Sequence, residues 1–156
     1  VDVMQELVKR GYNVSMDVLG AGPLMDMLIE KTQSAGLADR LCFQGSVGDI
    51  PARLANAQLY VHPAWYEPFG LVIVEAMASG LPVIALDGYG NRELSVQGKN
   101  GFLVAADASA ADFADKIAYM IDHPELAEEM GRFAKTFAQK FNIDTYTDKL
   151  LDIYSR

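Results

Sequence analysis

Hydrophobic positions along the chain switch between helical and period-two spacing, which predicts helices and strands in alternation. Residues 2–11 carry an apolar helical face that ends at Gly11, and residues 12–20 then alternate as a strand does. Further helices are expected at residues 23–36, 49–57 and 70–80, with a helical turn at 91–98. Further strands are expected at residues 40–45, 58–63, 82–86 and 101–104.

The strand pattern ends near residue 108, and three amphipathic helices are expected after it, at residues 109–122, 124–141 and 144–155. Short apolar strands separated by helices favour a parallel sheet with helices on both faces. The sequence therefore predicts an α/β fold, a Rossmann-like doubly wound parallel sheet with C-terminal helices. We expect residues 1–156 to form a single domain, because no repeat, low-complexity tract or linker interrupts the pattern.

Composition and charge narrow the classes of function. The 156 residues are 51% hydrophobic, enough for one compact core, and carry a net charge of −8. A chain this acidic, with no basic stripe, is a poor binder of nucleic acid. Cys42 is the only cysteine, which excludes an internal disulfide and a cysteine-based metal site. No apolar run is long enough to span a membrane and no signal peptide is evident, so we expect a cytoplasmic protein.

A glycine turn follows the first expected strand. Gly20, Ala21, Gly22 and Pro23 connect it to a helix, and such a turn exposes backbone N–H groups that can bind an anion. Met25 stands where the dinucleotide fingerprint has its third glycine, so the turn argues against an NAD site. A tight turn without a ligand is the structural alternative.

Two glutamates frame the start of the helix at residues 70–80. Glu67 precedes Pro68 and should be extended, and Gly70 lets a helix begin or a ligand approach the backbone. Glu75 lies about 7 Å further along the axis, at about 1.5 Å per residue. One carboxylate can accept a hydrogen bond from each of two adjacent ribose hydroxyls. The spacing therefore allows a sugar nucleotide along the helix start, with Glu67 near the sugar and Glu75 on the ribose.

Structural roles are an equal alternative on spacing alone. Glu67 would then cap the helix N-terminus, and Glu75 would lie on a solvated face. The apolar neighbours of Glu75 leave little polar surface on this helix, so its carboxylate is expected to need a partner or a ligand.

The residues around this pair resemble a known family. The stretch EPFGLVIVE resembles the E-x7-E motif of retaining glycosyltransferases with the GT-B fold, often called family 4 or group 1. LGAGP, CFQGSV, VHPAWYEPFG, EAMASGLPVIA and GNRELSVQGKNGFLV resemble successive landmarks of that family's C-terminal domain, in order and over nearly the whole chain. The resemblance implies the C-terminal, donor-binding half of a GT-B glycosyltransferase.

The resemblance also implies roles for the helix start. Glu67 is expected to contact the transferred sugar and to orient it rather than attack it, in a reaction with front-face departure and attack. Glu75 is expected to hold the ribose hydroxyls. The backbone amides of Phe69, Gly70 and Leu71 are expected to face the diphosphate or the sugar.

Further donor contacts are implied at the ends of the first two strands. Gly20 and Gly22 match the family's glycine turn beside the nucleotide. Gly45, Ser46 and Val47 match the segment that cradles the base, mostly through backbone groups. The donor is expected to be a UDP-, GDP- or ADP-sugar, a substrate rather than a cofactor, and no metal site or cofactor is expected.

The chain departs from the family at several positions. Ala64 replaces a common serine, and Tyr89 stands where a glycine is common. Arg92 is read as a surface or packing residue, and Glu93 as a residue that secures its turn. His62 borders the expected site and is read as a framework residue, because a lone histidine there is more often hydrogen-bonded than catalytic.

The family's first strand, its Gly-Arg turn, a following Lys-Gly and the N-terminal acceptor domain have no counterpart here. The Arg and Lys are implied to neutralise the donor diphosphate. We therefore expect a fragment of a longer hexosyltransferase of polysaccharide biosynthesis, inactive on its own. The missing strand belongs mid-sheet, so the remaining strands are expected to close the gap, expose an edge, or pair with another copy in a homo-oligomer.

Two other classes of function remain open. A non-catalytic nucleotide-binding or interaction module would share every feature of this chain, and only its longer sequence would separate it from the enzyme. A flavodoxin-like regulator would need acidic residues at strand ends, which Asp17 and Asp87 supply only loosely, and it leaves Glu75 unexplained. The acceptor is unknown, and in the full-length protein docking at a membrane surface is a further option.

Overall fold

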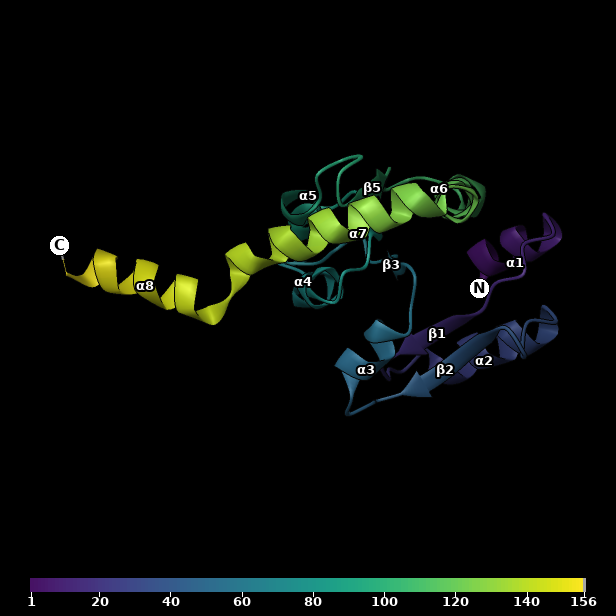
Figure 1. The fold of residues 1–156 in the computed structure, drawn as a ribbon. Coiled ribbons are helices and arrows are strands. Elements are labelled where there is room, and N and C mark those ends of the chain that lie inside the picture. The colour runs from purple at the N-terminus through teal and green to yellow at the C-terminus, as the bar shows by residue number, and fades with distance from the viewer. Residues whose placement is uncertain (156) are drawn as a thin grey trace. The chain divides into compact units, whose positions relative to one another are not determined.

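The computed structural model describes residues 1–155 and alternates helices with short parallel strands (Figure 1). The strands are β1 (Met16–Leu19), β2 (Leu41–Gly45), β3 (Tyr60–His62), β4 (Val83–Leu86) and β5 (Gly101–Val104). The helices are α1 (Asp2–Lys9), α2 (Met25–Ser34), α3 (Ile50–Ala55), α4 (Leu71–Ala78), α5 (Tyr89–Leu94), α6 (Ala110–Asp122), α7 (Pro124–Ala138) and α8 (Ile143–Tyr154), with a 3-10 turn η1 (Gln139–Phe141).

The predicted element order is confirmed, with shifted boundaries. The first strand begins at Met16 rather than at residue 12, and α2 begins two residues after Pro23. The turn expected at 91–98 is a short helix, α5, that begins earlier, at Tyr89. The chain divides into two compact units, one made of residues 1–50 and 107–122, the other of residues 51–106 and the chain from residue 123 onward.

The first unit is built on a parallel pair of strands. β1 and β2 run in register from Met16 opposite Leu41 to Val18 opposite Phe43, and an irregularity follows, so that Leu19 lies opposite Gly45. α1 buries Met4 and Leu7 and packs against α6, although α6 lies about a hundred residues later in the sequence.

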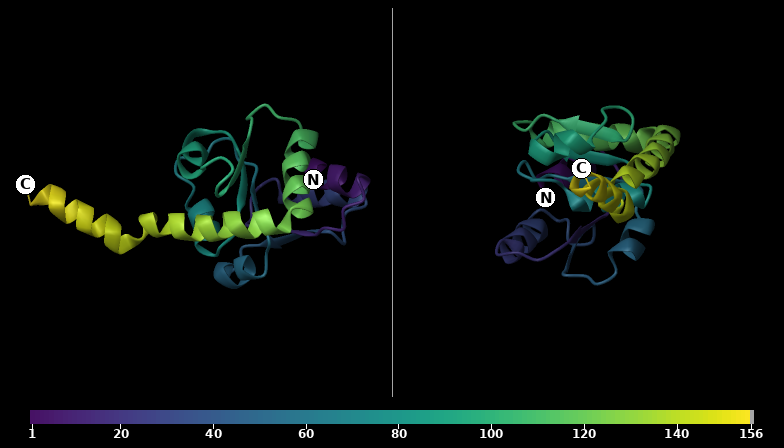
Figure 2. Two further views of the ribbon diagram at one scale, coloured as in Figure 1. Left: turned by 45° about the horizontal axis from the view of Figure 1, so that its top comes forward. Right: turned by 90° about the vertical axis from the view of Figure 1, so that its left-hand side faces the viewer.

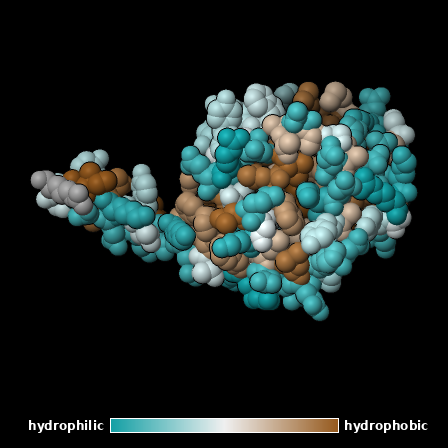
Figure 3. All heavy atoms as spheres, turned by 90° about the horizontal axis from the view of Figure 1, so that it is seen from above, coloured by the Kyte–Doolittle hydropathy of each residue, from teal (hydrophilic) through white to brown (hydrophobic). Residues whose placement is uncertain are grey.

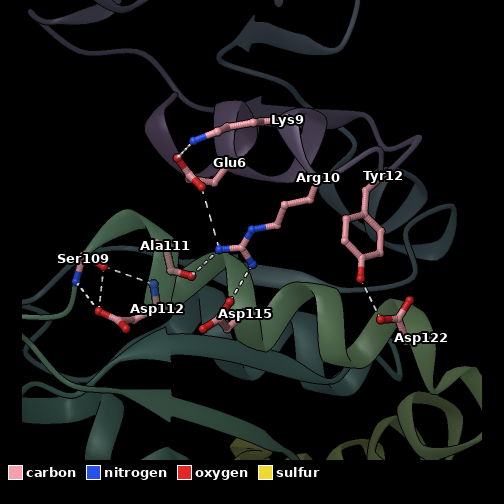
Figure 4. A network of polar contacts seen from close by, with 9 residues as sticks. All are labelled: Glu6, Lys9, Arg10, Tyr12, Ser109, Ala111, Asp112, Asp115 and Asp122. Carbon is pink, nitrogen blue, oxygen red and sulfur yellow. Dashed lines mark hydrogen bonds and ion pairs between the residues drawn. The ribbon is translucent and has the colours of Figure 1, made fainter.

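Polar contacts join α1 and the turn after it to α6 (Figure 4). The Arg10 guanidinium donates to the Asp115 carboxylate and to the Ala111 carbonyl, and Tyr12 donates to Asp122 at 2.6 Å. These contacts are exposed, so they orient the two helices more than they stabilise them. The apolar face of α1 supplies the larger stabilising term.

The second unit is built on the three-stranded parallel sheet β3-β4-β5, with β4 in the centre. β4 is buried, as its unbroken apolar sequence Val-Ile-Ala-Leu requires in the centre of a parallel sheet. Its core includes Ile73 and Met77 of α4, Val83 of β4 and Ala134 of α7. α4 and α7 pack together, and Gly131 makes this approach close, because a Cβ atom there would lie 2.2 Å from the Gly80 carbonyl oxygen.

The three C-terminal helices behave differently from one another. α6 and α7 each bury one face, including Met120 and Met130. Figure 2 shows α8 continuing beyond α7 as a separate arm, and none of its residues is buried. Figure 3 shows this arm with brown apolar spheres among polar ones. Ile143, Leu151 and Ile153 are all more than 60% exposed, so α8, unlike α6 and α7, buries no apolar face among the described residues.

The strands form two separate parallel sheets, one in each unit. Within residues 1–155, β1 pairs with β2 only and β3 with β4 only, so each has one side without a strand partner. No helix among the described residues is long and apolar enough to cross a membrane.

Candidate functional site

The loop after β3 carries Glu67 and ends in the first turn of α4. Gly70 is the N-cap residue of α4 and adopts the left-handed conformation, with φ 87° and ψ 50°, which glycine tolerates best. The Gly70 N–H donates to Oε1 of Glu67 at 3.1 Å. The carboxylate thus lies against the helix start, as the capping alternative anticipated. It also means that the Gly70 N–H, expected to face the donor, is already engaged by Glu67.

The first N–H groups of α4 remain available. Among the described residues, no acceptor bonds the backbone N–H of Leu71 or Val72, while Ile73 and Val74 both donate to the Gly70 carbonyl. Unpaired N–H groups at a helix start carry partial positive charge that favours an anion. Leu71 is also 66% exposed.

Glu75 lies on the exposed side of α4, four residues after Leu71 and therefore on the same face. Its carboxylate makes no hydrogen bond or ion pair with any described residue. The opposite face is fully buried through Ile73, Ala76 and Met77. The apolar neighbours of Glu75 in the sequence suggested that apolar side chains would enclose its carboxylate. The structure shows instead that Glu75 is exposed. The exposed face of α4 carries this carboxylate together with the apolar side chains of Leu71 and Val72.

A short segment that includes the start of α5 holds the Glu67 loop in place. Asn91 is fully buried, and its Nδ2 donates to the carbonyl oxygens of Ala64 at 2.8 Å and Leu86 at 2.9 Å. The Gly90 N–H donates to the Glu67 carbonyl at 2.8 Å. A Cβ atom on Gly88 would lie 2.0 Å from the Trp65 carbonyl oxygen, so the two backbones touch where no side chain fits.

Sequence reasoning missed Asn91 and assigned its task to Glu93. Glu93 is exposed, whereas Asn91 bonds both the Glu67 loop and the end of β4. A polar residue directly after the two glycines Gly88 and Gly90 was the signal that could have identified it. Arg92 is a surface residue, as expected, and forms an ion pair with Asp87 at 2.7 Å.

Beneath the two glutamates lie a tyrosine and a histidine of β3. Burial raises the pKa of Tyr60 to about 12, and the carboxylates of Glu75 and Glu67 add to the shift. Burial lowers the pKa of His62, against the opposing effect of Glu67. Both side chains are therefore neutral near pH 7, so no positive charge from this pair offsets the two carboxylates.

Exposed aromatic rings surround the Glu67 loop. Trp65, Tyr66 and Tyr89 are each about 60% exposed or more. Tyr66 meets Tyr89 edge to face, with ring centroids 5.1 Å apart. Tyr89, the departure from the family's glycine, thus adds a ring to this group, and the rings line the rim of the loop rather than the core.

The remaining predicted residues lie in the first unit, where the ends of β1 and β2 meet. The Gly20 N–H donates to the Gly45 carbonyl at 2.8 Å, and both glycines have positive φ angles. Gly22 and Ser46 are exposed beside them, and Val47 is half-buried. The structure thus brings the glycine turn and the segment after β2 together, and their adjacent turns offer backbone groups at one end of this sheet.

Groups of three or more His, Cys, Asp or Glu side chains that could hold a metal ion do not occur among residues 1–155. The polar chemistry of the second unit consists instead of carboxylates, a helix start and neutral ring groups. This set can bind hydroxyl groups and an anion.

Comparison with known proteins places the chain in a family. The family model described as glycosyl transferases group 1 matches residues 1–137. The alpha-D-kanosaminyltransferase of Streptomyces kanamyceticus is 31% identical over 99% of this chain and 40% of its own length. The lipopolysaccharide core biosynthesis mannosyltransferase LpsB of Rhizobium meliloti is 39% identical over 71% of this chain and 33% of its own length. The chain thus spans well under half of these relatives.

Solved structures agree with the family. Anabaena Alr3699/HepE, crystallised in complex with UDP, superposes with a TM-score of 0.88 at 28% identity, over 98% of this chain and 44% of its own. TarM of Staphylococcus aureus superposes with a TM-score of 0.91 at 27% identity, over 99% of this chain and 32% of its own. These similarities confirm the predicted α/β, Rossmann-like half of a GT-B fold. The chain belongs to the group 1 glycosyl transferases.

Proposed function

We propose that this chain is the C-terminal, donor-binding half of a retaining glycosyltransferase that transfers a hexosyl group from a nucleoside diphosphate sugar. In this proposal Glu75 binds the ribose hydroxyls and Glu67 orients the sugar. Leu71 and Phe69 offer amides to the diphosphate or the sugar. The turns at Gly20, Gly22, Gly45, Ser46 and Val47 receive the nucleotide.

One observation carries the proposal. Glu75 is an exposed carboxylate with no hydrogen bond or ion pair to the described residues, and it shares a helix face with the N–H groups of Leu71 and Val72, which no described acceptor bonds. A nucleoside diphosphate sugar offers the complement, an anionic diphosphate for the N–H groups and two vicinal hydroxyls for the carboxylate. The UDP complexes of Alr3699/HepE support this class of ligand.

The contacts of Glu67 support an orienting role. Its Oε1 already accepts a hydrogen bond from Gly70, and the carboxylate is fixed at the loop end. A residue that orients the sugar can keep this hydrogen bond, because each carboxylate oxygen can accept a second hydrogen bond from a sugar hydroxyl.

We extend the proposal to the whole protein only by its relatives. They are transferases more than twice as long as this chain, which supports an acceptor-binding domain elsewhere in a longer protein. LpsB and its lipopolysaccharide core support a role in polysaccharide biosynthesis. We expect the 156-residue chain alone to show no transfer, and turnover by the pure chain would contradict this.

Calorimetric titration of the chain with UDP, GDP and ADP tests the donor site. We expect saturable binding of one nucleotide, weakened about 10- to 100-fold by Glu75→Ala, because charge-assisted hydrogen bonds to the ribose are lost. Glu129→Ala, an exposed glutamate of α7 in the same unit, is the matched control and should leave binding unchanged.

The two outcomes separate the parts of the proposal. Equal affinity of the wild type and Glu75→Ala would refute the ribose assignment while leaving nucleotide binding intact. Absence of binding for all three nucleotides would refute donor binding by this chain alone. The same titration would then be repeated on a protein that includes the family's Gly-Arg turn.

A further inference from the structure

Tyr60 and His62 form a stacked pair directly beneath the candidate site. They lie two residues apart on β3, so their side chains leave the strand on the same face. Their ring centroids are 6.1 Å apart and the ring planes are within 20° of each other. Tyr60 packs against the core of the second unit, and His62 is 8% exposed. The core therefore fixes the plane of the imidazole ring.

The Nε2 atom of His62 is buried and has no hydrogen-bond partner among the described residues. Its nearest carboxylate oxygen is Oε2 of Glu67, at 3.7 Å. The other oxygen of that carboxylate, Oε1, accepts the Gly70 N–H at 3.1 Å. A buried nitrogen without a partner is rare and costly, so a small movement that joins Nε2 to Oε2 is favoured.

The far side of the ring decides which nitrogen carries the proton. Nδ1 of His62 lies 3.5 Å from the Tyr60 hydroxyl. A neutral imidazole has one donor nitrogen and one acceptor nitrogen, and the second is free to face a donor. Tyr60 keeps its proton at neutral pH, so it can donate to Nδ1. The proton of His62 then resides on Nε2, which faces Glu67.

The charged groups around the pair agree with this order. Glu67 faces the ring from the loop after β3, and Glu75 of α4 acts on the Tyr60 hydroxyl. Both are carboxylates, which accept and do not donate when ionised. The donors among these four side chains are therefore the Tyr60 hydroxyl and the His62 ring, and the two glutamates only accept.

We propose that His62 is a positioning residue for Glu67, with Tyr60 holding the imidazole as the Nε2–H tautomer so that Nε2 donates to Oε2. Glu67 is then anchored through both oxygens, by Gly70 and by His62, and each oxygen keeps one acceptor site for a sugar hydroxyl. The importance of these Tyr60–His62–Glu67 hydrogen bonds for sugar binding rests on the proposed function. The tautomer of His62 does not depend on that function.

Nitrogen-15 NMR of the ring tests the tautomer without any ligand. The chain has two histidines, so His123→Gln leaves the signals of His62 alone. At pH 7.5 we expect Nε2 to resonate as a protonated nitrogen and Nδ1 as an unprotonated one, in a single tautomer. Tyr60→Phe should convert this spectrum toward a mixture of tautomers. An Nδ1–H tautomer in the wild type, or unchanged nitrogen shifts in Tyr60→Phe, would overturn the proposal.

A titration tests the positioning itself. UDP and UDP-glucose, with GDP and GDP-mannose in parallel, are compared on the wild type, His62→Leu and His62→Gln. We expect His62→Leu to lower the preference for the sugar nucleotide over the free nucleotide about tenfold, with free-nucleotide affinity unchanged. His62→Gln, whose amide can donate near the Nε2 position, should stay within about threefold of the wild type.

The outcomes distinguish the two proposals. If free nucleotide fails to bind the wild type, donor binding by this chain alone is refuted, and the NMR measurement still decides the tautomer and its dependence on Tyr60. If nucleotide binds but His62→Leu keeps the full preference for the sugar, the positioning role is refuted. Equal losses in the Leu and Gln variants would indicate a packing role for His62 and would also refute it.

Discussion

Replacement of Asn91 by alanine is the most direct test of how the Glu67 loop is held. The substitution removes two hydrogen bonds, to the Ala64 and Leu86 carbonyls, from a fully buried side chain. Each is worth about 1 kcal/mol net, and carbonyls left without a partner add about 1–3 kcal/mol more. Oδ1 of Asn91 has no partner among the described residues, so its removal offsets part of this loss. We expect unfolding free energy to fall by about 2–3 kcal/mol.

Urea denaturation followed by far-UV circular dichroism measures this loss, and amide hydrogen exchange localises it. The Gly90 N–H, bonded to the Glu67 carbonyl, should exchange faster because it joins the same two segments. Asn56→Ala is the matched control. Asn56 is exposed and donates one hydrogen bond to the Ala52 carbonyl at 2.8 Å, so we expect a change within about 0.5 kcal/mol.

A second substitution at the same position sharpens the test. Asn91→Asp places a carboxylate against two carbonyl oxygens, which raises its pKa in the folded state. The variant should therefore be most stable at low pH and should lose stability as pH rises through that pKa. If Asn91→Ala is no more destabilising than Asn56→Ala, or if Asn91→Asp shows no such pH dependence, the clamping role is refuted.

Three further predictions concern packing and pH. Gly131→Ala should destabilise the protein in thermal melts, despite the higher helix propensity of alanine, because its Cβ would meet the Gly80 carbonyl; Gly48→Ala, where space is open, should be nearly neutral. Leu7→Ala should cost about 2–5 kcal/mol in urea denaturation by leaving a cavity under α1, and a cost below about 1 kcal/mol would contradict the packing described. Burial lowers the pKa of His62, so the unfolded chain binds its proton more readily; the stability difference between wild type and His62→Gln should be constant above pH 6.5 and shrink as pH falls below it, and a pH-independent difference would show that the ring does not titrate as described.

Several features of the site followed from local sequence. The sequence EPFG, followed by an apolar stretch, predicted a helix that starts at Gly70. The residue before a proline is extended, and glycine permits the left-handed turn found there. The turn at residues 20–22 predicted exposed backbone N–H groups at the end of β1. The ends of β1 and β2 meet there, because the two strands are parallel neighbours. These predictions rest on short-range geometry, which a few neighbouring residues control.

Other features could not be predicted in the same way. Glu75 has apolar neighbours in sequence, yet it is exposed. The face of α4 that packs against the sheet and α7 is the buried one, and Glu75 lies on the other side. Asn91, twenty-seven residues from Ala64, becomes the clamp of the Glu67 loop because β3 and β4 are adjacent strands.

Local sequence pattern was enough to predict the alternation of helices and strands, the start of α4 and the placement of the two glutamates around it. All three depend on periodicity and on residues with restricted or unusual backbone angles. Long-range packing controls which side of each helix is buried, which residue secures the loop, and that Tyr60 and His62 lie under the carboxylates. Burial, hydrogen-bond partners and pKa shifts arise from contacts between segments far apart in the chain. Local sequence pattern does not show which of these segments come into contact.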